Sequence, residues 1–330
     1  MTKLMILASI FLSSNIGFKP VEVYIGGDNI VFELNDVGIT VTGGYDINYN
    51  NGKYNPIDSK DINVGDVIVG VNGEKITGIK DFVDKISSFN EYVILNIDNG
   101  SDKKINICKE NGMIKTGLYV KDKTLGSGTL TFIDPKSSYY VALGHPIFDI
   151  ERKKKVEFEG GAIYDTSVEG IKKGCNGSPG EKITSTRLDN KIGNIIKNDS
   201  FGLFGKIIGE FINNKQKYQI CPKNNVKLGT AYIYTVIKGV NKEKFLIEIT
   251  SLHKQDENGQ KGIEFEIKDK YLLSVAGGVY SGMSGSPIIQ DNKIIGAVTH
   301  VKVDNIKQGY GLYASNMYQR LESFTKKANI

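Results

Sequence analysis

The chain has 330 residues, of which 40% are hydrophobic and 24% charged, and a formal net charge of +5. This length exceeds one typical domain and suits two, and the composition excludes an intrinsically disordered chain. Glycine is abundant (38 residues) and β-branched residues recur in short runs, which predicts many short strands joined by turns. The densest basic run, "ERKKKVEFE" at 151–159, is interpreted as a solvated loop or strand end, so we expect no nucleic-acid partner.

The three cysteines, Cys108, Cys175 and Cys221, lie far apart in the sequence. An odd count without a CxxC spacing argues against a disulfide framework and against a zinc site. We therefore expect no metal ion and no cofactor.

Residues 1–20 place one lysine before a mostly apolar stretch at 4–18. A membrane-spanning helix needs about 20 apolar residues, so this stretch favours a signal sequence or a short membrane anchor. A buried first strand or helix is the alternative. No later segment is apolar enough to cross a bilayer, so we expect the rest of the chain to be exported across a membrane or tethered to one.

Residues 21–112 are predicted to form strands, tight turns and one helix. The pair Asn72-Gly73 is a strong hairpin signal. In "GIKDFVDKISSF" at 78–89, apolar residues recur on one face of a helix. This block, and above all "GDVIVGVNGEKI" with the helix after it, resembles a PDZ domain of the kind found in bacterial proteases.

The resemblance implies a groove for a peptide tail. The peptide would add as an extra strand along residues 30–34, and N–H groups of the preceding loop would receive its terminal carboxylate. The predicted peptide-binding residues are Gly26, Gly27, Asp28, Asn29 and Ile30. A small β-domain without any ligand is the alternative.

From residue 113 to residue 330 almost every segment is predicted to be strand or turn, and a helix is predicted at 315–328. The absence of alternating strands and helices excludes doubly wound folds. Many short antiparallel strands followed by a helix are typical of a two-barrel serine protease, and they would also suit a large β-sandwich.

The stretch "GMSGSP" at 282–287 is a candidate nucleophile turn. Ser284 would attack a substrate carbonyl, and the N–H groups of Gly282 and Ser284 would form an oxyanion hole. The strand "PIIQ" follows and turns back through Asp291-Asn292 into "KIIGAVTHV". Such a turn followed by a tight hairpin resembles the chymotrypsin-like proteases, although an ordinary Gly/Ser turn remains the alternative.

A serine nucleophile needs a base, and the chain has three histidines. His145 ends the strand "YYVALGH", where a side chain is well placed to face a cleft. His253 lies in a polar turn, and His300 follows an apolar strand and is expected to support a pocket wall or a hydrogen bond. We therefore predict His145 as the general base.

A third group would orient the imidazole, and three carboxylates are candidates. Asp149 follows His145 by four residues, Asp134 lies in the preceding hairpin, and Asp269 precedes the serine by fifteen residues. The spacing alone does not decide among them.

The motifs "GTLTFIDPKSSYYVALGHPIFD", "GMSGSPIIQDNKIIGAVTHV" and "QGYGLY" behind a PDZ-like block resemble the serine peptidase family of stage IV sporulation protein B. The resemblance covers residues 22–325. It implies a mainly β fold: a PDZ-like domain at 21–112, then a chymotrypsin-like double β-barrel at 113–330 with a C-terminal helix. It also implies that His145, Asp269 and Ser284 form the catalytic triad.

The family resemblance further implies a signalling protease of endospore-forming bacteria. Its expected substrate is a membrane-associated protein in the space around the forespore, and its PDZ domain is expected to regulate it. Self-processing is less certain, because the N-terminal region is short. The alternatives are a catalytically silent PDZ adaptor and a cysteine hydrolase that uses Cys175.

Overall fold

The computed structural model describes residues 20–185, 188–213, 215–254 and 259–328. The predicted signal sequence or anchor at 1–20 lies, except for residue 20, outside the described residues. None of the described helices is long and apolar enough to span a bilayer.

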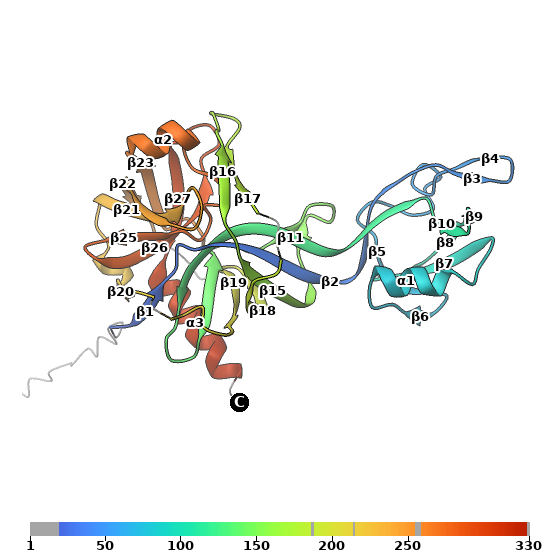
Figure 1. Cartoon of the computed structure of the whole chain (residues 1–330), viewed down its shortest axis with the longest axis horizontal. Helices are drawn as coiled ribbons and strands as arrows, with labels where there is room; N and C mark the ends of the chain where they lie inside the picture. Colours follow the sequence, from blue (N-terminus) through green and yellow to red (C-terminus); the bar gives the residue numbers. More distant parts are fainter. Residues whose placement is uncertain (1–19, 186–187, 214, 255–258, 329–330) are drawn as a thin grey trace, which may run out of the picture.

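The larger part of the molecule contains two closed antiparallel β-barrels (Figure 1). In the first barrel each strand pairs with the next in the ring β2–β11–β12–β19–β18–β15, and β15 pairs with β2 to close it. Its strands are β2 (Asn29–Gly44), β11 (Leu118–Ile133), β12 (Tyr139–Leu143), β15 (Phe158–Asp165), β18 (Lys191–Asp199) and β19 (Gly202–Ile207).

The second barrel closes in the same way, in the ring β21–β22–β23–β27–β26–β25. Its strands are β21 (Gly229–Val236), β22 (Lys242–Leu252), β23 (Ile263–Ile267), β25 (Pro287–Gln290), β26 (Lys293–Val301) and β27 (Gln308–Tyr313). The chain is therefore a mainly β, chymotrypsin-like double-barrel protein, as predicted.

A third hydrophobic core joins the two barrels. Val23 and Phe132 from the first half of the chain pack there with Leu312 and with Met317 of the C-terminal helix α3 (Ala314–Ala328). The strands β1 (Glu22–Ile25) and β20 (Lys217–Ile220) connect the barrels at this point, since β1 pairs with β11 and β20, and β20 with β26. The helix predicted at 315–328 is α3.

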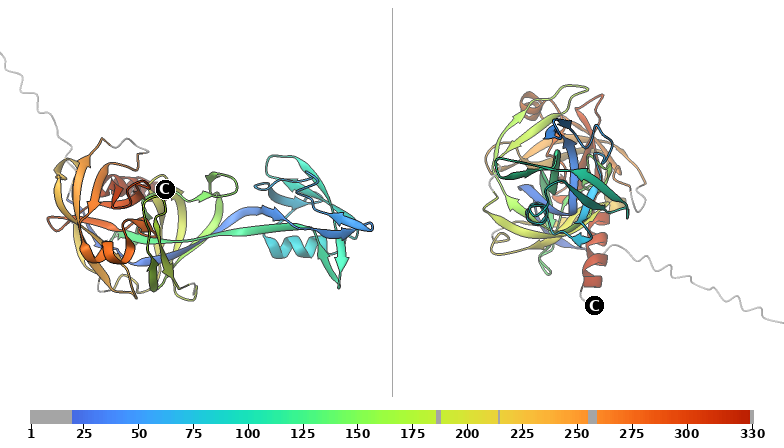
Figure 2. Two further views of the ribbon diagram at one scale, coloured as in Figure 1. Left: turned by 90° about the horizontal axis from the view of Figure 1, so that it is seen from above. Right: turned by 90° about the vertical axis from the view of Figure 1, so that its right-hand side faces the viewer.

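A smaller domain stands apart from the barrels at the end of two long strands, β2 and β11 (Figures 1 and 2). Its own core includes Ile39, Ile68, Phe82 and Leu118. Its elements between the two long strands are β3 (Ile47–Tyr49), β4 (Gly52–Tyr54), β5 (Val67–Val71), β6 (Glu74–Lys75), α1 (Ile79–Ile86), β7 (Tyr92–Ile97), β8 (Asp102–Asn106), β9 (Cys108–Glu110) and β10 (Met113–Lys115).

Two hairpins and a short strand lie outside both barrel rings, and two further short helices complete the elements. They are β13 (Phe148–Asp149) with β14 (Lys154–Lys155), β16 (Val168–Lys172) with β17 (Gly180–Thr184), β24 (Tyr280–Ser281), the 3₁₀ helix η1 (Lys223–Asn225) and α2 (Lys270–Ala276). The basic run at 151–159 begins on the β13–β14 hairpin and continues into β15.

The small domain is an insertion into the first barrel, so the predicted division at residue 112 is not where the strands divide. The first part of β2 contributes Ile30 and Leu34 to the barrel core, and the same strand contributes Ile39 to the core of the small domain. Gly38 lies between the two parts with a φ of +75°, a conformation that favours glycine.

The predicted peptide groove along residues 30–34 is wrong. At Leu34, β2 pairs on one edge with Thr124 of β11 and on the other with Gly161 of β15, so no edge is open to an added strand. The predicted carboxylate-binding loop is also engaged, because the N–H groups of Gly26 and Gly27 donate to carbonyls of β11.

The two polar residues of that predicted loop are likewise occupied by the barrel. Asp28 forms ion pairs with Lys215 (2.9 Å) and Lys242 (3.0 Å). Asn29 is 2% exposed and pairs with Thr129 of β11.

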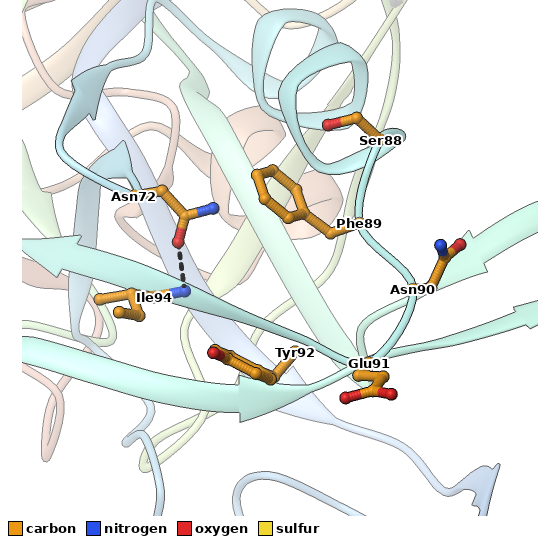
Figure 3. A pocket seen from close by; sticks show the side chains of 7 residues that line it. All are labelled: Asn72, Ser88, Phe89, Asn90, Glu91, Tyr92 and Ile94. Carbon is orange, nitrogen blue, oxygen red and sulfur yellow. Dashed lines mark hydrogen bonds between the residues drawn. The ribbon is translucent and has the colours of Figure 1, made fainter.

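The small domain has a pocket of about 510 Å³ beside the C-terminal end of α1 (Figure 3). Partly exposed apolar side chains of Phe89, Tyr92 and Ile94 line it. Asn72 closes one side, where its Oδ1 accepts a hydrogen bond from the N–H of Ile94 (2.9 Å).

Candidate active site

The predicted nucleophile turn connects β24 to β25. Gly282 and Gly285 both have positive φ angles, +93° and +90°, which glycine adopts without the steric penalty of other residues. A Cβ on Gly285 would lie 2.1 Å from the carbonyl oxygen of Thr129. The turn therefore requires glycine on both sides of Ser284, which is half-buried.

Two N–H groups of this turn have no protein acceptor within the described part of the chain: those of Gly282 and Ser284. Their neighbours are bonded, since the N–H of Met283 donates to Tyr280 O (3.2 Å) and that of Gly285 donates to Val298 O (2.8 Å). Alternate free N–H groups around a serine are the donor arrangement that an oxyanion needs.

Strand β11 of the first barrel holds the turn in place. Thr129 Oγ1 donates to Gly282 O (3.0 Å), and Thr131 Oγ1 donates to Gly285 O (2.8 Å). The N–H of Thr129 also donates to Ser284 O (2.9 Å). Both threonines are 0% exposed. Sequence reasoning missed them, although polar residues at alternate positions of the apolar strand "TLTFI" were a usable signal.

His145 follows the end of β12. Its Nδ1 lies 3.0 Å from Pro146 O, and because a carbonyl only accepts, Nδ1 carries the proton and Nε2 is left as the basic nitrogen. Burial lowers the pKa of His145 below its usual 6.5, and the Pro146 carbonyl partly opposes this shift. The imidazole is therefore neutral at pH 7, as a general base requires.

Ser284 and His145 share no hydrogen bond in the described structure. Ser284 Oγ instead donates to Thr299 O (3.1 Å) on β26. Hydrogen bonds between a nucleophile and its base are often loose before substrate binds, and a rotation of the serine side chain would release Oγ from Thr299.

His300 lies against His145, with ring centroids 5.5 Å apart and the planes tilted by 43°. Burial, and secondarily the charge that His145 can carry, lowers the pKa of His300 to about 4. Its Nδ1 is buried without a hydrogen-bond partner among the described residues. His300 thus lies beside the proposed base, and its expected place in a pocket wall stays a prediction.

Asp269 has other partners than His145 in this structure. It is the N-cap of α2, where Oδ1 accepts from the N–H of Leu272 (2.8 Å). Its Oδ2 accepts from the N–H of Leu246 (3.4 Å). Both oxygens thus serve the backbone, and no hydrogen bond joins Asp269 to His145 in the described residues.

The other two candidate carboxylates are also engaged elsewhere. Asp149 forms an ion pair with Lys121 (3.2 Å) and accepts from the N–H of Arg152 (2.8 Å). Asp134 accepts from the N–H of Ser137 (3.1 Å) in its own hairpin. Within the described chain, neither carboxylate bonds to His145.

A buried asparagine fixes the segment after His145. Asn198 on β18 is 4% exposed; its Oδ1 accepts from the N–H of Ile147 (2.8 Å) and its Nδ2 donates to Ile147 O (2.9 Å). Two bonds to one residue position the chain next to the imidazole. No sequence pattern pointed to Asn198, because the contact spans 51 residues.

The remaining candidates lie away from this arrangement. His253 Nε2 lies 2.9 Å from Glu264 Oε1 at the surface. Cys175 is an exposed free thiol in a turn closed by its own backbone bonds to Ser178. The structure therefore offers no histidine partner for Cys175 among the residues it describes.

Comparison with known proteins gives a family. The sequence profile of the family described as "SpoIVB peptidase S55" matches residues 112–318. No curated protein gives a significant match. Among solved structures, the Rv3671c protease in its inactive form is 12% identical, with a TM-score of 0.36 over 60% of this chain and 83% of that one. The active form of this protease from M. tuberculosis is 14% identical, with a TM-score of 0.37 over 60% and 74% of the two chains. The chain belongs to the SpoIVB peptidase S55 family and is a serine peptidase.

Proposed function

We propose that this serine peptidase cleaves protein substrates with Ser284 as nucleophile and His145 as general base. The N–H groups of Gly282 and Ser284 receive the oxyanion. One observation carries this assignment: within the described chain the N–H groups of Gly282 and Ser284 have no acceptor, whereas those of Met283 and Gly285 are bonded.

The reaction follows from these positions. Ser284 Oγ leaves Thr299 O and bonds to the substrate carbonyl carbon, while its proton passes to Nε2 of His145. The carbonyl oxygen becomes negative between the two N–H groups. The C–N bond then breaks as Nε2 returns the proton to the leaving amine, and water repeats the sequence to release the acyl group.

The imidazole needs a group that fixes its tautomer. Pro146 O already accepts from Nδ1, and we propose that this carbonyl sets the tautomer in the resting protein. Asp269, which the family resemblance implies for this role, would have to leave the N-cap of α2 to act there. A substitution that keeps the cap separates these possibilities and is given in the Discussion.

We further propose that the small domain regulates the peptidase. Strand β11 begins with Leu118 in the core of that domain and ends with Thr129 and Thr131, which bond to the nucleophile turn. A second link runs from Asp98 to Arg152 (2.7 Å), on the hairpin that follows His145. A movement of the small domain would thus reach both the nucleophile turn and the His145 segment.

The biological setting is also a proposal. The family description names a sporulation protein, which supports a signalling protease that acts on a membrane-associated protein near the forespore. The apolar N-terminal segment supports export or tethering, and self-processing remains part of the proposal. We propose that a peptide tail binds the small domain in the pocket beside α1, and not along residues 30–34 as the sequence had predicted.

Labelling with a fluorophosphonate tests the catalytic assignment. Wild-type protein is expected to be labelled at Ser284, whereas Ser284→Ala is not labelled and His145→Ala is labelled at least about 1000-fold more slowly. Ser281→Ala is the matched control, because Ser281 is an exposed serine directly before the same turn. Absence of label on folded wild-type protein would favour the silent adaptor, and a label on Cys175 by a thiol reagent that abolishes activity would favour the cysteine hydrolase.

A further inference from the structure

A lysine side chain lies buried beside the nucleophile turn. Lys182 is on β17, whose residues Gly180 and Glu181 pair in parallel with Tyr280 and Ser281 of β24. This register brings Lys182 next to Gly282. A Cβ built on Gly282 would lie 2.9 Å from Lys182 Cβ and 3.5 Å from its Cδ, so the lysine stem runs along the turn that carries Ser284.

The ammonium of Lys182 has no counter-ion among the residues that the structure describes. The side chain is 4% exposed, and Nζ is buried without a hydrogen-bond partner in the described part of the chain. A charge away from water is unfavourable unless it is paired, and buried lysines are accordingly almost always paired. An unpaired buried lysine beside the proposed oxyanion hole suits a partner that carries negative charge only during the reaction.

The groups around Lys182 do not supply that negative charge. Across the ladder from it on β16 is Ile171, and its chain neighbour Glu181 is exposed. From β24 the ring of Tyr280 faces the ammonium, with its centroid 5.8 Å from Nζ. Burial raises the pKa of Tyr280 well above neutrality, so this phenol is uncharged. From β11 the hydroxyl oxygen of Ser127, an uncharged group, lies 3.5 Å from a Cβ built on Gly282.

We propose that Lys182 stabilises the oxyanion as a buried positive charge beside Gly282. When Ser284 Oγ bonds to the carbonyl carbon, its proton goes to His145 and the carbonyl π pair moves onto the oxygen. Lys182 keeps its protons throughout and gains a counter-charge that the resting protein lacks. An attraction that exists only in the transition state raises kcat rather than substrate affinity. The inference rests on the proposed roles of Ser284 and His145.

The test compares Lys182→Met, which keeps an unbranched side chain one atom shorter and removes its charge, with Lys172→Met on the exposed end of β16. The measured quantity is the second-order rate constant of fluorophosphonate labelling at Ser284. We expect Lys182→Met to lower this rate constant by roughly 10- to 100-fold, which is no more than the effect of removing one oxyanion-hole donor. Lys172→Met should label at the wild-type rate.

Two further readouts separate this role from a structural one. Phenylboronic acid forms a tetrahedral anion on an active-site serine, so its protection of Ser284 against labelling should weaken by a similar factor in Lys182→Met. Removing an uncompensated buried charge should also leave the thermal unfolding temperature unchanged or higher.

The pH profile supplies a third readout. Burial lowers the pKa of Lys182 to about 7. The wild-type labelling rate should therefore fall as the pH rises above about 7 and Lys182 loses its charge, and this alkaline decline should be absent in Lys182→Met.

Three outcomes would overturn the inference. In the first, Lys182→Met is labelled at the wild-type rate. In the second, it loses stability while its folded fraction is labelled normally, which indicates a structural role. In the third, it loses all labelling while His145→Ala is still labelled, which makes Lys182 the general base. A wild-type protein that no fluorophosphonate labels would instead refute the proposed function, and the inference with it.

Discussion

The imidazole rings of His145 and His300 lie in contact, with centroids 5.5 Å apart. Two protonated rings at this separation repel each other, and both are largely removed from water, so the folded protein favours the neutral form of each. The pKa of His145 is below 6.5 and that of His300 is about 4. Burial thus keeps the proposed base unprotonated at neutral pH.

The first prediction concerns activity at low pH. Labelling of Ser284 requires neutral His145, so the rate should hold down to pH 6.5 and decline only below it, because the pKa of His145 is lowered. Replacing His300 by Phe keeps an aromatic ring against His145 and should leave this decline in place. A decline centred above pH 6.5 would show that His145 is not the group that titrates.

Stability should depend on pH through His300. Its pKa is about 4 when folded and about 6.5 when unfolded, so the unfolded chain binds more protons between these values and stability falls as the pH is lowered through this window. The loss amounts to at most about 3 kcal/mol. Urea unfolding at pH 7 and pH 4.5 should show a smaller difference for His300→Phe than for wild type.

Asp269→Asn separates a helix cap from a catalytic acid. Asparagine caps a helix about as well as aspartate, so the variant should fold normally, and we expect its labelling rate to stay within about tenfold of wild type. Asp269→Ala, which lacks the cap, should lose roughly 1 kcal/mol of unfolding free energy. A fall of about 10⁴-fold in Asp269→Asn would mean that the carboxylate reaches His145 in the active protein, as the family resemblance implies.

Thr129→Val tests the support of the nucleophile turn. Valine keeps the shape but leaves Gly282 O without its buried donor, at a cost of about 1–3 kcal/mol, and the loosened turn should label roughly tenfold more slowly. Thr124→Val on the same strand is the control, because the Thr124 hydroxyl bonds to Asp36 (3.0 Å) away from the turn. Equal labelling of the two variants would argue against a role for Thr129.

Phe82→Ala tests regulation by the small domain. Phe82 of α1 is 3% exposed in the core of that domain, and its truncation should destabilise the domain by about 3–5 kcal/mol. If β11 transmits this change, the labelling rate at Ser284 should shift severalfold. Val83→Ala on the same helix, where Val83 is 50% exposed, should label like wild type. An unchanged rate in Phe82→Ala, with proteolysis showing the small domain unfolded, would make the domain a spacer.

The sequence by itself determined the local features of the fold and the site. The pair Asn72-Gly73 forms its turn with two positive φ angles, 51° and 86°, and Asp291-Asn292 does the same with 48° and 56°. These residues adopt such angles at little energetic cost, so each hairpin turn can be predicted from about four consecutive residues. The glycines around Ser284 predicted the sharp turn at 282–285 for the same reason, and both have positive φ angles in the structure.

Helix amphipathicity was readable in the same local way, but only in part. Phe82 and Ile86 of α1 are buried as the pattern predicted, whereas Val83 between them is half exposed. Periodicity gives the apolar face of a helix, and how much of that face is covered depends on the strands packed against it.

Only the tertiary structure decided which strands share a core. The sixteen residues of β2 form one continuous strand in the structure, yet one end lies in a barrel and the other in the inserted domain. Strand pairing depends on partners far along the chain, and alternation of apolar residues does not name them. The predicted peptide groove was wrong for this reason.

The surroundings of Ser284 have the same origin. Thr129 and Lys182 precede Gly282 of the turn by 100 residues or more, and His300 reaches His145 from the other barrel. Local sequence could supply the nucleophile, its glycines and a candidate base. The groups that surround these residues came together only when the two barrels packed against each other, because burial and pairing are properties of the packed chain.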